Sequence, residues 1–255
     1  MTESKNEAAE EPQNRESKGT GAMERDFQYR HEWKHEINTA DMIAIRQRMR
    51  AVARPDPHAT DGRYRIRSLY FDNLKDKALR EKIDGVDRRE KWRVRFYNMD
   101  PSAVIHLEKK SRRNGLGAKF SASLTQEEAQ KLADGDFDWM MEERGDEKET
   151  SLVREFYSRI LSQGLRPKVI VDYIREPFIF EAGNVRVTLD YDIRTGLYCT
   201  DFLNPDCVTI PARDAPILLE VKWDAYLPSI IRDAVQLKNR RAEAFSKYAV
   251  CRAYG

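Results

Sequence analysis

The stretch that decides the fold is Lys91-Trp92-Arg93-Val94-Arg95-Phe96, in which a cation stands at every second position and an apolar side chain at each position between. Because successive side chains of a β-strand point to opposite faces, such a strand has one apolar face and one cationic face. Neighbouring like charges cost free energy unless an opposite charge lies between them. This strand therefore predicts a sheet with one face toward a core and the other toward a bound anion.

Four further segments show the same alternation. Their charged positions are Arg30, Glu32, Lys34 and Glu36; Glu108 and Lys110; Arg186 and Asp190; and Glu220 and Lys222. An antiparallel sheet with one solvated face also alternates in this way, and for any one strand that reading stays open. The charged positions here repeat Arg and Lys with occasional carboxylates instead of a mixture of polar residues. If these faces met inside a closed barrel, they would line a tunnel for a polyanion.

The composition limits the classes of protein that fit. The chain has 255 residues, of which 35% are charged, and a formal net charge of +2. This length suits one domain, and this charge does not predict a broad nucleic-acid-binding surface. The three cysteines are odd in number and form no CxxC pair, so we expect reduced thiols and a cytoplasmic location. No apolar run reaches the roughly 18 residues that span a bilayer, so a partner would have to bring the chain to a membrane.

We expect a disordered tail at residues 1–25, which are nearly free of large apolar side chains, and one α+β domain at 26–255. Its fold is predicted to be a closed antiparallel β-barrel tunnel of about eight strands with flanking helices. The expected strands are 27–37, 64–71, 91–97, 104–110, 119–122, 168–175, 178–181, 185–192 and 217–223. Helical spacing and boundary signals predict helices near 42–52, 151–163 and 228–241, and a capping box at Thr125–Glu128 predicts the start of another. A short helix or turn is expected at 72–82.

The order of several short motifs resembles the VTC domain, the catalytic domain of polyphosphate polymerases in the triphosphate tunnel metalloenzyme superfamily, which is CYTH-like. The motifs are Glu32-Trp33-Lys34, Ser68-Leu69-Tyr70-Phe71-Asp72, the stretch 91–95, Leu107-Glu108-Lys109-Lys110, Val185-Arg186-Val187-Thr188-Leu189-Asp190, Leu219-Glu220-Val221-Lys222 and Ser246-Lys247-Tyr248. The resemblance covers roughly residues 27–248, and its specificity lies in the order of the motifs, since each alone is common.

The resemblance implies a metal-dependent transferase that moves the γ-phosphate of ATP onto a growing polyphosphate chain inside a basic tunnel. It implies that Lys34, Arg93, Arg95, Lys110, Lys119, Arg175, Arg186, Lys222, Ser246 and Lys247 bind phosphate. Lys34, Arg93, Arg95, Arg175, Arg186 and Glu220 would be the catalytic set. Glu220 would hold Mn²⁺ or Mg²⁺, with Glu32, Glu108 and Asp190 as weaker candidates. Phosphoryl transfer suits such a site because it needs positioning and positive charge more than covalent help.

Other functions remain open from the sequence. A tripolyphosphate or nucleoside triphosphate phosphohydrolase would use the same charges, although such enzymes usually carry Glu-x-Glu-x-Lys where this chain has Arg30-His31-Glu32-Trp33-Lys34. A polyphosphate-binding module without catalysis is a third reading, and Glu220 argues against it. A nucleic-acid binder is disfavoured because the aromatic side chains mostly alternate away from the cations. Ala244 stands where eukaryotic members carry a further Lys, and Lys238, Arg240 and Arg241 are candidates to replace its charge.

Overall fold

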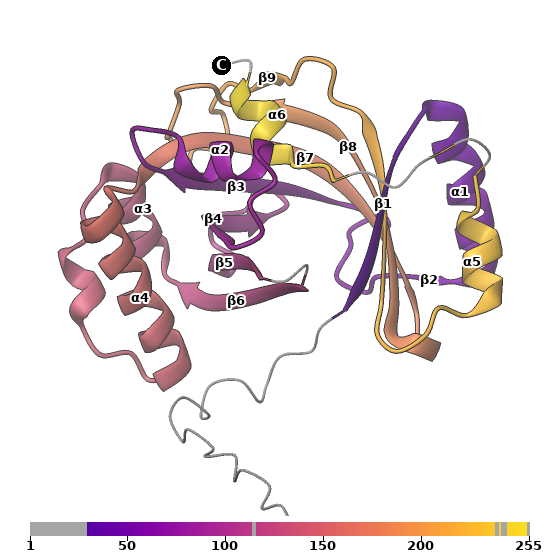
Figure 1. Cartoon of the computed structure of the whole chain (residues 1–255), viewed down its shortest axis with the longest axis horizontal. Helices are drawn as coiled ribbons and strands as arrows, with labels where there is room; N and C mark the ends of the chain where they lie inside the picture. Colours follow the sequence, from indigo (N-terminus) through magenta and orange to yellow (C-terminus); the bar gives the residue numbers. More distant parts are fainter. Residues whose placement is uncertain (1–29, 114–115, 238–239, 241–243, 254–255) are drawn as a thin grey trace, which may run out of the picture.

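The computed structural model describes residues 30–113, 116–237, 240 and 244–253, so the predicted tail and the residues of the first strand before Arg30 lie outside it. Its centre is one strongly curled antiparallel sheet (Figure 1). The main path of hydrogen-bonded neighbours is β1 (His31–Ile37), β10 (Ile217–Trp223), β8 (Val185–Thr195), β7 (Arg166–Phe180), β3 (Tyr64–Asp72), β4 (Arg89–Tyr97), β5 (Ile105–Arg113) and β6 (Leu116–Leu124). Two short strands join it, β2 (Arg54–Pro55) on β7 and β9 (Ile210–Pro211) on β8.

The prediction of a closed barrel is wrong for the part of the chain that the structure describes. β1 and β6 form the two ends of the strand order, and no pairing joins them. Both end regions carry inward-facing lysines, Lys34 on β1 and Lys119 on β6. The sheet is an open half-barrel with one concave and one convex face.

Two groups of helices cover the convex face at opposite sides of the sheet (Figure 1). One group is α3 (Gln126–Asp134), the 3₁₀ helix η1 (Asp138–Met141) and α4 (Glu147–Gln163). The other is α1 (Thr39–Val52) and α5 (Ser229–Val235). The predicted helix starts at Asn38 and Thr125 are confirmed, and both residues form capping boxes.

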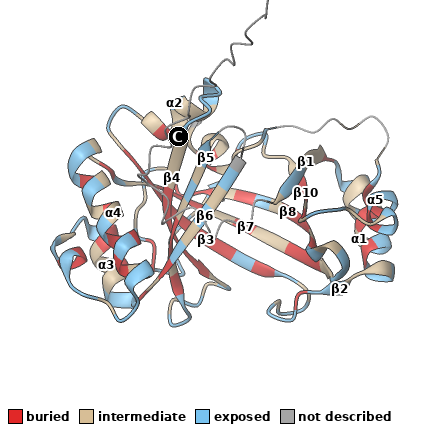
Figure 2. Ribbon diagram, turned by 60° about the horizontal axis from the view of Figure 1, so that its bottom comes forward, coloured by how far each residue is buried: buried red, intermediate tan, exposed pale blue. Residues whose placement is uncertain are grey.

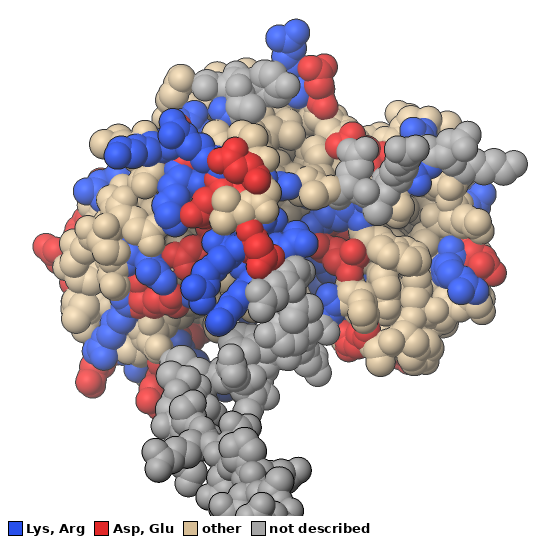
Figure 3. Space-filling model, viewed as in Figure 1, with Lys and Arg blue, Asp and Glu red and all other residues tan. Residues whose placement is uncertain are grey.

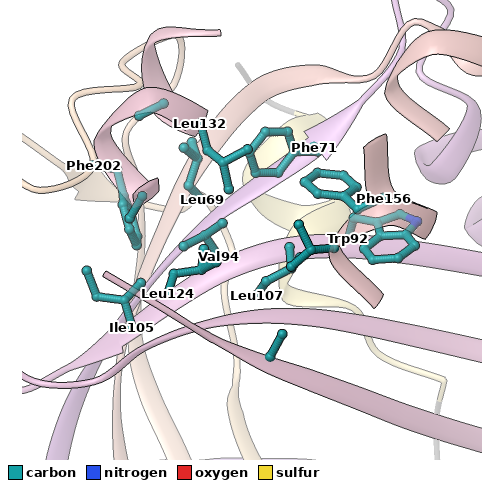
Figure 4. Close-up of a cluster of buried hydrophobic side chains, with 14 of the residues drawn as sticks. Leu69, Phe71, Trp92, Val94, Ile105, Leu107, Leu124, Leu132, Phe156 and Phe202 are labelled. Atoms are coloured by element: carbon teal, nitrogen blue, oxygen red, sulfur yellow. The ribbon is translucent and has the colours of Figure 1, made fainter. Parts of the chain in front are cut away.

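The convex face of β3, β4, β5 and β6 supplies the largest core cluster. Trp92 stacks on Phe156 of α4 with ring centroids 4.7 Å apart, and Phe71 meets Phe156 edge-on at 5.0 Å (Figure 4). The apolar residues of the stretch 91–96 are therefore the ones buried under the helices, as their alternation predicts. A second cluster on the other half of the convex face packs Val187, Leu219 and Val221 against α1 and α5. Figure 2 shows that the buried residues concentrate along the strands.

A third cluster lies on the concave face and holds α2 (Lys77–Ile83) and α6 (Lys247–Ala253) against the sheet. Tyr248 of α6 is 1% exposed and stacks on Tyr70 of β3 at 5.0 Å. The sequence did not predict a helix at α6, and the helix predicted over 228–241 is in fact the shorter α5. α6 fills one end of the concave face and brings the Ser246-Lys247-Tyr248 motif onto it.

Three other boundaries differ from the predictions. The two strands expected around Glu176 and Pro177 are one continuous strand, β7. α4 begins at Glu147, because Asp146 accepts a hydrogen bond from the backbone of Glu149 and acts as its N-cap, so the last four residues of the loop expected at 141–150 are helical. Leu116 and Gly117, expected in a turn, already belong to β6. Among the described residues, no helix combines the length and the apolar character needed to cross a bilayer.

Candidate functional site

The strand register gathers the predicted phosphate ligands on the concave face. Directly paired positions form five rows: Lys34, Glu220 and Thr188; Lys222 and Arg186; Tyr64, Arg175 and Asp190; Tyr70, Arg93 and Glu108; and Lys91, Lys110 and Lys119. Paired residues point to the same face of a sheet, so each row projects its side chains together. The predicted inward orientation of Lys110 and Lys119 is thus supported by the observed register. In Figure 3, Lys and Arg gather near the middle of the face shown, with carboxylates among them.

Glu220 lies at the centre of one group of cations. Its carboxylate oxygens are 3.8 Å from Lys34 Nζ, 3.5 Å from Lys222 Nζ, 3.4 Å from an Arg175 nitrogen and 3.8 Å from Lys247 Nζ. Burial would raise the pKa of Glu220, but these four charges hold it well below its usual value. Glu220 is therefore a buried carboxylate that stays ionised while none of its cations makes a close contact with it. Such an oxygen pair remains available to a further ligand.

Asp190 makes shorter contacts with its cations than Glu220 does. Arg175 donates to both of its oxygens at 2.6 Å, and Lys247 Nζ lies 2.6 Å from Oδ2. Asp190 is 0% exposed, so it acts as the internal anion that holds these two cations in place. This contact makes Asp190 a positioning residue and weakens its case as a metal ligand.

Glu108 holds the cations of β4. Arg93 Nε donates to it at 2.7 Å, Lys119 Nζ lies at 2.6 Å and an Arg95 nitrogen at 3.8 Å. Arg95 also donates to Ser68 Oγ at 2.9 Å and Tyr173 Oη at 3.0 Å, while Arg93 donates to Tyr70 Oη at 2.8 Å. Both guanidinium groups are thereby fixed on the concave face before any ligand arrives.

Arg186 lies at one end of the concave face and has a partner that the sequence did not suggest. Its guanidinium is 2.7 Å from Asp56 Oδ2, and Asp56 also accepts a hydrogen bond from Tyr64 Oη at 3.1 Å. The Arg186 side chain keeps 37% of its surface exposed. It can therefore meet a ligand, but it does so beside a fixed carboxylate and not as a free cation.

A group of cations centred on Lys91 lies where β4 meets α6. Lys91 Nζ donates to Ser246 Oγ at 2.8 Å and lies 5.6 Å from the centre of the Tyr248 ring. Burial lowers the pKa of Lys91 to about 7, helped by the charges of Lys82, Arg89, Lys34 and Arg93. The alternation pattern included Lys91, but no phosphate-binding role was predicted for it. The accumulated positive charge marks this place as a site for an anion.

Lys110 adds to the same unbalanced charge. Lys110 is exposed, and its pKa is lowered first by the positive charge of Arg93, with Lys222 contributing from β10. β10 and β5 are far apart in the strand order, so the curvature of the sheet brings their side chains within electrostatic reach. A multiply charged anion in the concavity would remove this repulsion.

Ala244 stands where eukaryotic members of the family that the sequence resembles carry a lysine, and Lys238, Arg240 and Arg241 were the candidates to replace that positive charge. Arg240 is turned away and pairs with Asp41 of α1 at 2.8 Å, so its predicted role there is wrong. Lys238 and Arg241 lie outside the described residues. Lys82 of α2 donates to the Ala244 carbonyl at 2.6 Å and places its charge next to this position. Nothing in the sequence around Lys82 indicated this role, apart from its position in the segment 72–82 that precedes β4.

The residues around Glu220 fit a divalent metal that takes only one or two ligands from the protein. Among the described residues, no three His, Cys, Asp or Glu side chains come together as a metal site. Glu32 shares Lys34 and Lys222 with Glu220, through contacts of 2.7 and 3.2 Å, so it is the nearest second carboxylate. Mg²⁺ commonly binds through one or two carboxylates and takes its other ligands from water and phosphate. The donors present therefore suit a metal that arrives with a phosphate ligand.

We expect the affinity for tripolyphosphate to fall by about tenfold between pH 7 and 9, because Lys91 loses its proton in that range, and a charge-assisted hydrogen bond contributes about 1.5–3 kcal/mol. The Lys91→Arg variant stays protonated and should show a smaller pH dependence. Isothermal titration calorimetry at several pH values measures both. Ionisation of tripolyphosphate itself affects wild type and Lys91→Arg equally. If the two proteins showed the same change of affinity with pH, Lys91 would not be the group that loses the proton.

Removing the hydroxyl of Tyr248 should loosen α6. Tyr248 Oη donates to the buried Asp72 at 2.6 Å, and the Asp72 carboxylate also caps the backbone of Ala78 at 2.9 Å. We expect Tyr248→Phe to lower the free energy of unfolding by about 1–3 kcal/mol, since Asp72 loses a buried partner. Urea denaturation measures this change, and Tyr198→Phe, at a residue 76% exposed, is the control. An equal effect of both substitutions would refute the anchoring role.

Comparisons with known proteins identify the family and the fold of the chain. A family model described as the VTC domain matches residues 29–254. Among solved structures, the chain is similar to HpAC1 from Hippeastrum, a candidate adenylyl cyclase described as having a dominant triphosphatase activity. The TM-score is 0.52 at 14% identity, over 89% of this chain and 96% of that one. A candidate adenylate cyclase from Bacillus halodurans matches with a TM-score of 0.44 at 14% identity, over 75% and 78% of the two chains. No curated protein matches the chain.

Proposed function

The chain belongs to the VTC domain family, and from this premise we propose that it is a metal-dependent polyphosphate polymerase acting on ATP. The observation that carries the proposal is the set of Arg and Lys side chains that converge on the concave face around one ionised, loosely held carboxylate, Glu220. Such a face suits a chain of phosphates, because it places charge at repeated intervals along a curved surface.

In this proposal the guanidinium groups of Arg93, Arg95 and Arg175 orient phosphate oxygens, since Arg can bind two of them at once. Lys34, Lys91, Lys110, Lys119, Lys222 and Lys247 add positive charge along the chain, and Ser246 offers a hydroxyl at the start of α6. Arg186 would contact the chain at the end of the concave face. Mn²⁺ or Mg²⁺ held by Glu220, with Glu32 nearby, would neutralise phosphate charge.

The state of the carboxylates favours transfer to phosphate over hydrolysis. Glu32, Glu108 and Asp190 each have a cation within 2.7 Å, so they are poorly placed to accept a proton from water, and the loosely held Glu220 is assigned to the metal. Water needs such a base to become a nucleophile, whereas the terminal oxygen of a polyphosphate chain is already anionic. The acceptor oxygen attacks the γ-phosphorus, the bond to the bridging oxygen breaks, and ADP leaves with that oxygen.

The test is to incubate the purified protein with ATP and Mn²⁺ and to measure ADP, free phosphate and acid-precipitable polyphosphate together. The polymerase predicts ADP with matching polyphosphate, both lost in Glu220→Gln. Free phosphate without polymer would make the protein a phosphohydrolase instead. Binding of polyphosphate with no turnover under any metal condition would leave a binding module.

A further inference from the structure

The loop between β8 and β9 carries two of the three cysteines and is held firmly against the convex face. Arg67 of β3 is 1% exposed, donates to the Asn204 carbonyl at 2.5 Å and forms a two-bond pair with Asp172 of β7 at 2.9 Å. Phe202 is 0% exposed and packs edge-on against Phe96 at 4.9 Å. The loop therefore keeps its conformation through contacts that involve no sulfur atom.

Within this loop the two thiols face each other. Cys199 Sγ lies 2.9 Å from Cys207 Sγ, although the residues are 8 positions apart in the chain. Each cysteine backbone is fixed in a turn, Cys199 N on the Gly196 carbonyl at 2.8 Å and Cys207 N on the Asn204 carbonyl at 3.1 Å. A disulfide has a sulfur separation of about 2.05 Å, so bond formation requires an approach of less than about 1 Å.

We propose that Cys199 and Cys207 are a redox modification site, which a peroxide converts into a reversible intramolecular disulfide that locks this loop on the convex face. The order of events follows from the environment of the sulfurs. Burial, with the hydrogen bond to Cys199, raises the pKa of the Cys207 thiol to about 12. Because the thiolate is the nucleophile, Cys207 is disfavoured as the first residue to react, and the first step is assigned to Cys199.

The chemistry balances with hydrogen peroxide as the oxidant. The Cys199 sulfur attacks one peroxide oxygen, the O–O bond breaks, and a sulfenic acid and one water form. The Cys207 sulfur then displaces the sulfenic oxygen, which leaves as a second water. Two thiols and one peroxide thus give one disulfide and two waters, and the two electrons lost by sulfur reduce the peroxide. A dithiol reductant reverses the change.

The modification site is separate from the candidate phosphate-binding face. Arg67 and the loop lie on the convex side of β3, whereas its neighbour Ser68 points to the concave side and holds Arg95 at 2.9 Å. The inference therefore does not depend on the proposed function. Oxidation should leave the far-UV circular dichroism spectrum unchanged, which serves as a check that the fold is intact.

The sequence offers a convenient test by mass spectrometry. Cleavage after Arg194 and Arg213 places both cysteines in one peptide, residues 195–213, and cleavage after Lys247 and Arg252 places Cys251 in another, residues 248–252. The full chain is reduced, freed of reductant, treated with hydrogen peroxide, denatured, alkylated with N-ethylmaleimide and digested with trypsin. We expect peptide 195–213 to be unalkylated and two hydrogens lighter than its dithiol form, and peptide 248–252 to carry one maleimide.

Reductant should restore two maleimides on peptide 195–213. The Cys251→Ser variant should oxidise as the wild type does, and Cys199→Ser should leave Cys207 open to alkylation. Two maleimides on peptide 195–213 after oxidation of a folded chain would overturn the proposal. Overoxidised cysteines without a link, or a disulfide to Cys251 or to a second chain as the main product, would overturn it equally.

Discussion

Replacing Glu108 by Gln should lower the free energy of unfolding by about 3–5 kcal/mol, because it leaves buried cations without their anion. Glu108 is 0% exposed, with Arg93, Arg95 and Lys119 around it. Burial alone would raise the pKa of Glu108, but these charges hold it far below its usual value. Urea denaturation at pH 7 measures the loss.

The control is Glu155→Gln, at a carboxylate 35% exposed that pairs with Lys109 and Arg159, where we expect a change below about 1 kcal/mol. The pH dependence supplies a second check. A carboxylate with a lowered folded-state pKa stabilises the protein above its unfolded pKa, and that contribution disappears as pH falls. The difference between wild type and variant should therefore shrink below the ordinary value of 4.5. Tripolyphosphate should restore part of the stability. A constant or negligible difference would refute the role of Glu108 as the internal anion.

Replacing Glu220 by Gln should reduce turnover of ATP by about a thousandfold, the size expected when several kcal/mol of metal-dependent stabilisation are lost. The substitution keeps the shape of the side chain and removes one negative charge from among Lys34, Lys222, Arg175 and Lys247. Binding of tripolyphosphate without metal should therefore persist or become tighter.

Steady-state kinetics measure the loss of turnover. The shift in melting temperature on adding tripolyphosphate without metal measures metal-free binding, and its further change on adding Mn²⁺ measures the metal-dependent part. The matched control is Glu181→Gln, at an exposed carboxylate paired with Arg54. A Glu220→Gln variant that retains full turnover would exclude Glu220 as a metal ligand. Loss of metal-free tripolyphosphate binding in the variant would instead indicate that the substitution disturbs the fold.

The sequence was sufficient to identify the faces of the strands, because alternation has a period of two and needs no knowledge of the rest of the chain. Lys34 and Glu220 were singled out separately and turn out to be directly paired. Arg93 and Lys110 also fall on the predicted face. The VTC-like order of motifs was confirmed by the family match over residues 29–254.

What could not be predicted depends on contacts between distant segments. Two strands, 168–175 and 178–181, were predicted where the structure has the single strand β7. In the structure, β7 pairs with β3 as far as Arg175 and with β2 from Phe178 onward, so Pro177 lies between these two partners and the strand continues. The pairing of Arg186 with Asp56, and the place of Lys91 beside Ser246, likewise join segments that share no local pattern.

The pairing of β1 with β10 also bears on how the molecule folds. It places Lys34 beside Glu220, so the row that would hold the metal exists only after the two most distant strands of the chain have met. Such a contact closes a very long loop, whose entropy must be lost before the pairing stabilises anything. Chains that have folded only their central strands thus already carry Arg93, Arg95 and Glu108 in register, but they lack the carboxylate row. In the proposed polymerase, the row that would hold the metal is therefore expected to form after the anion-binding row.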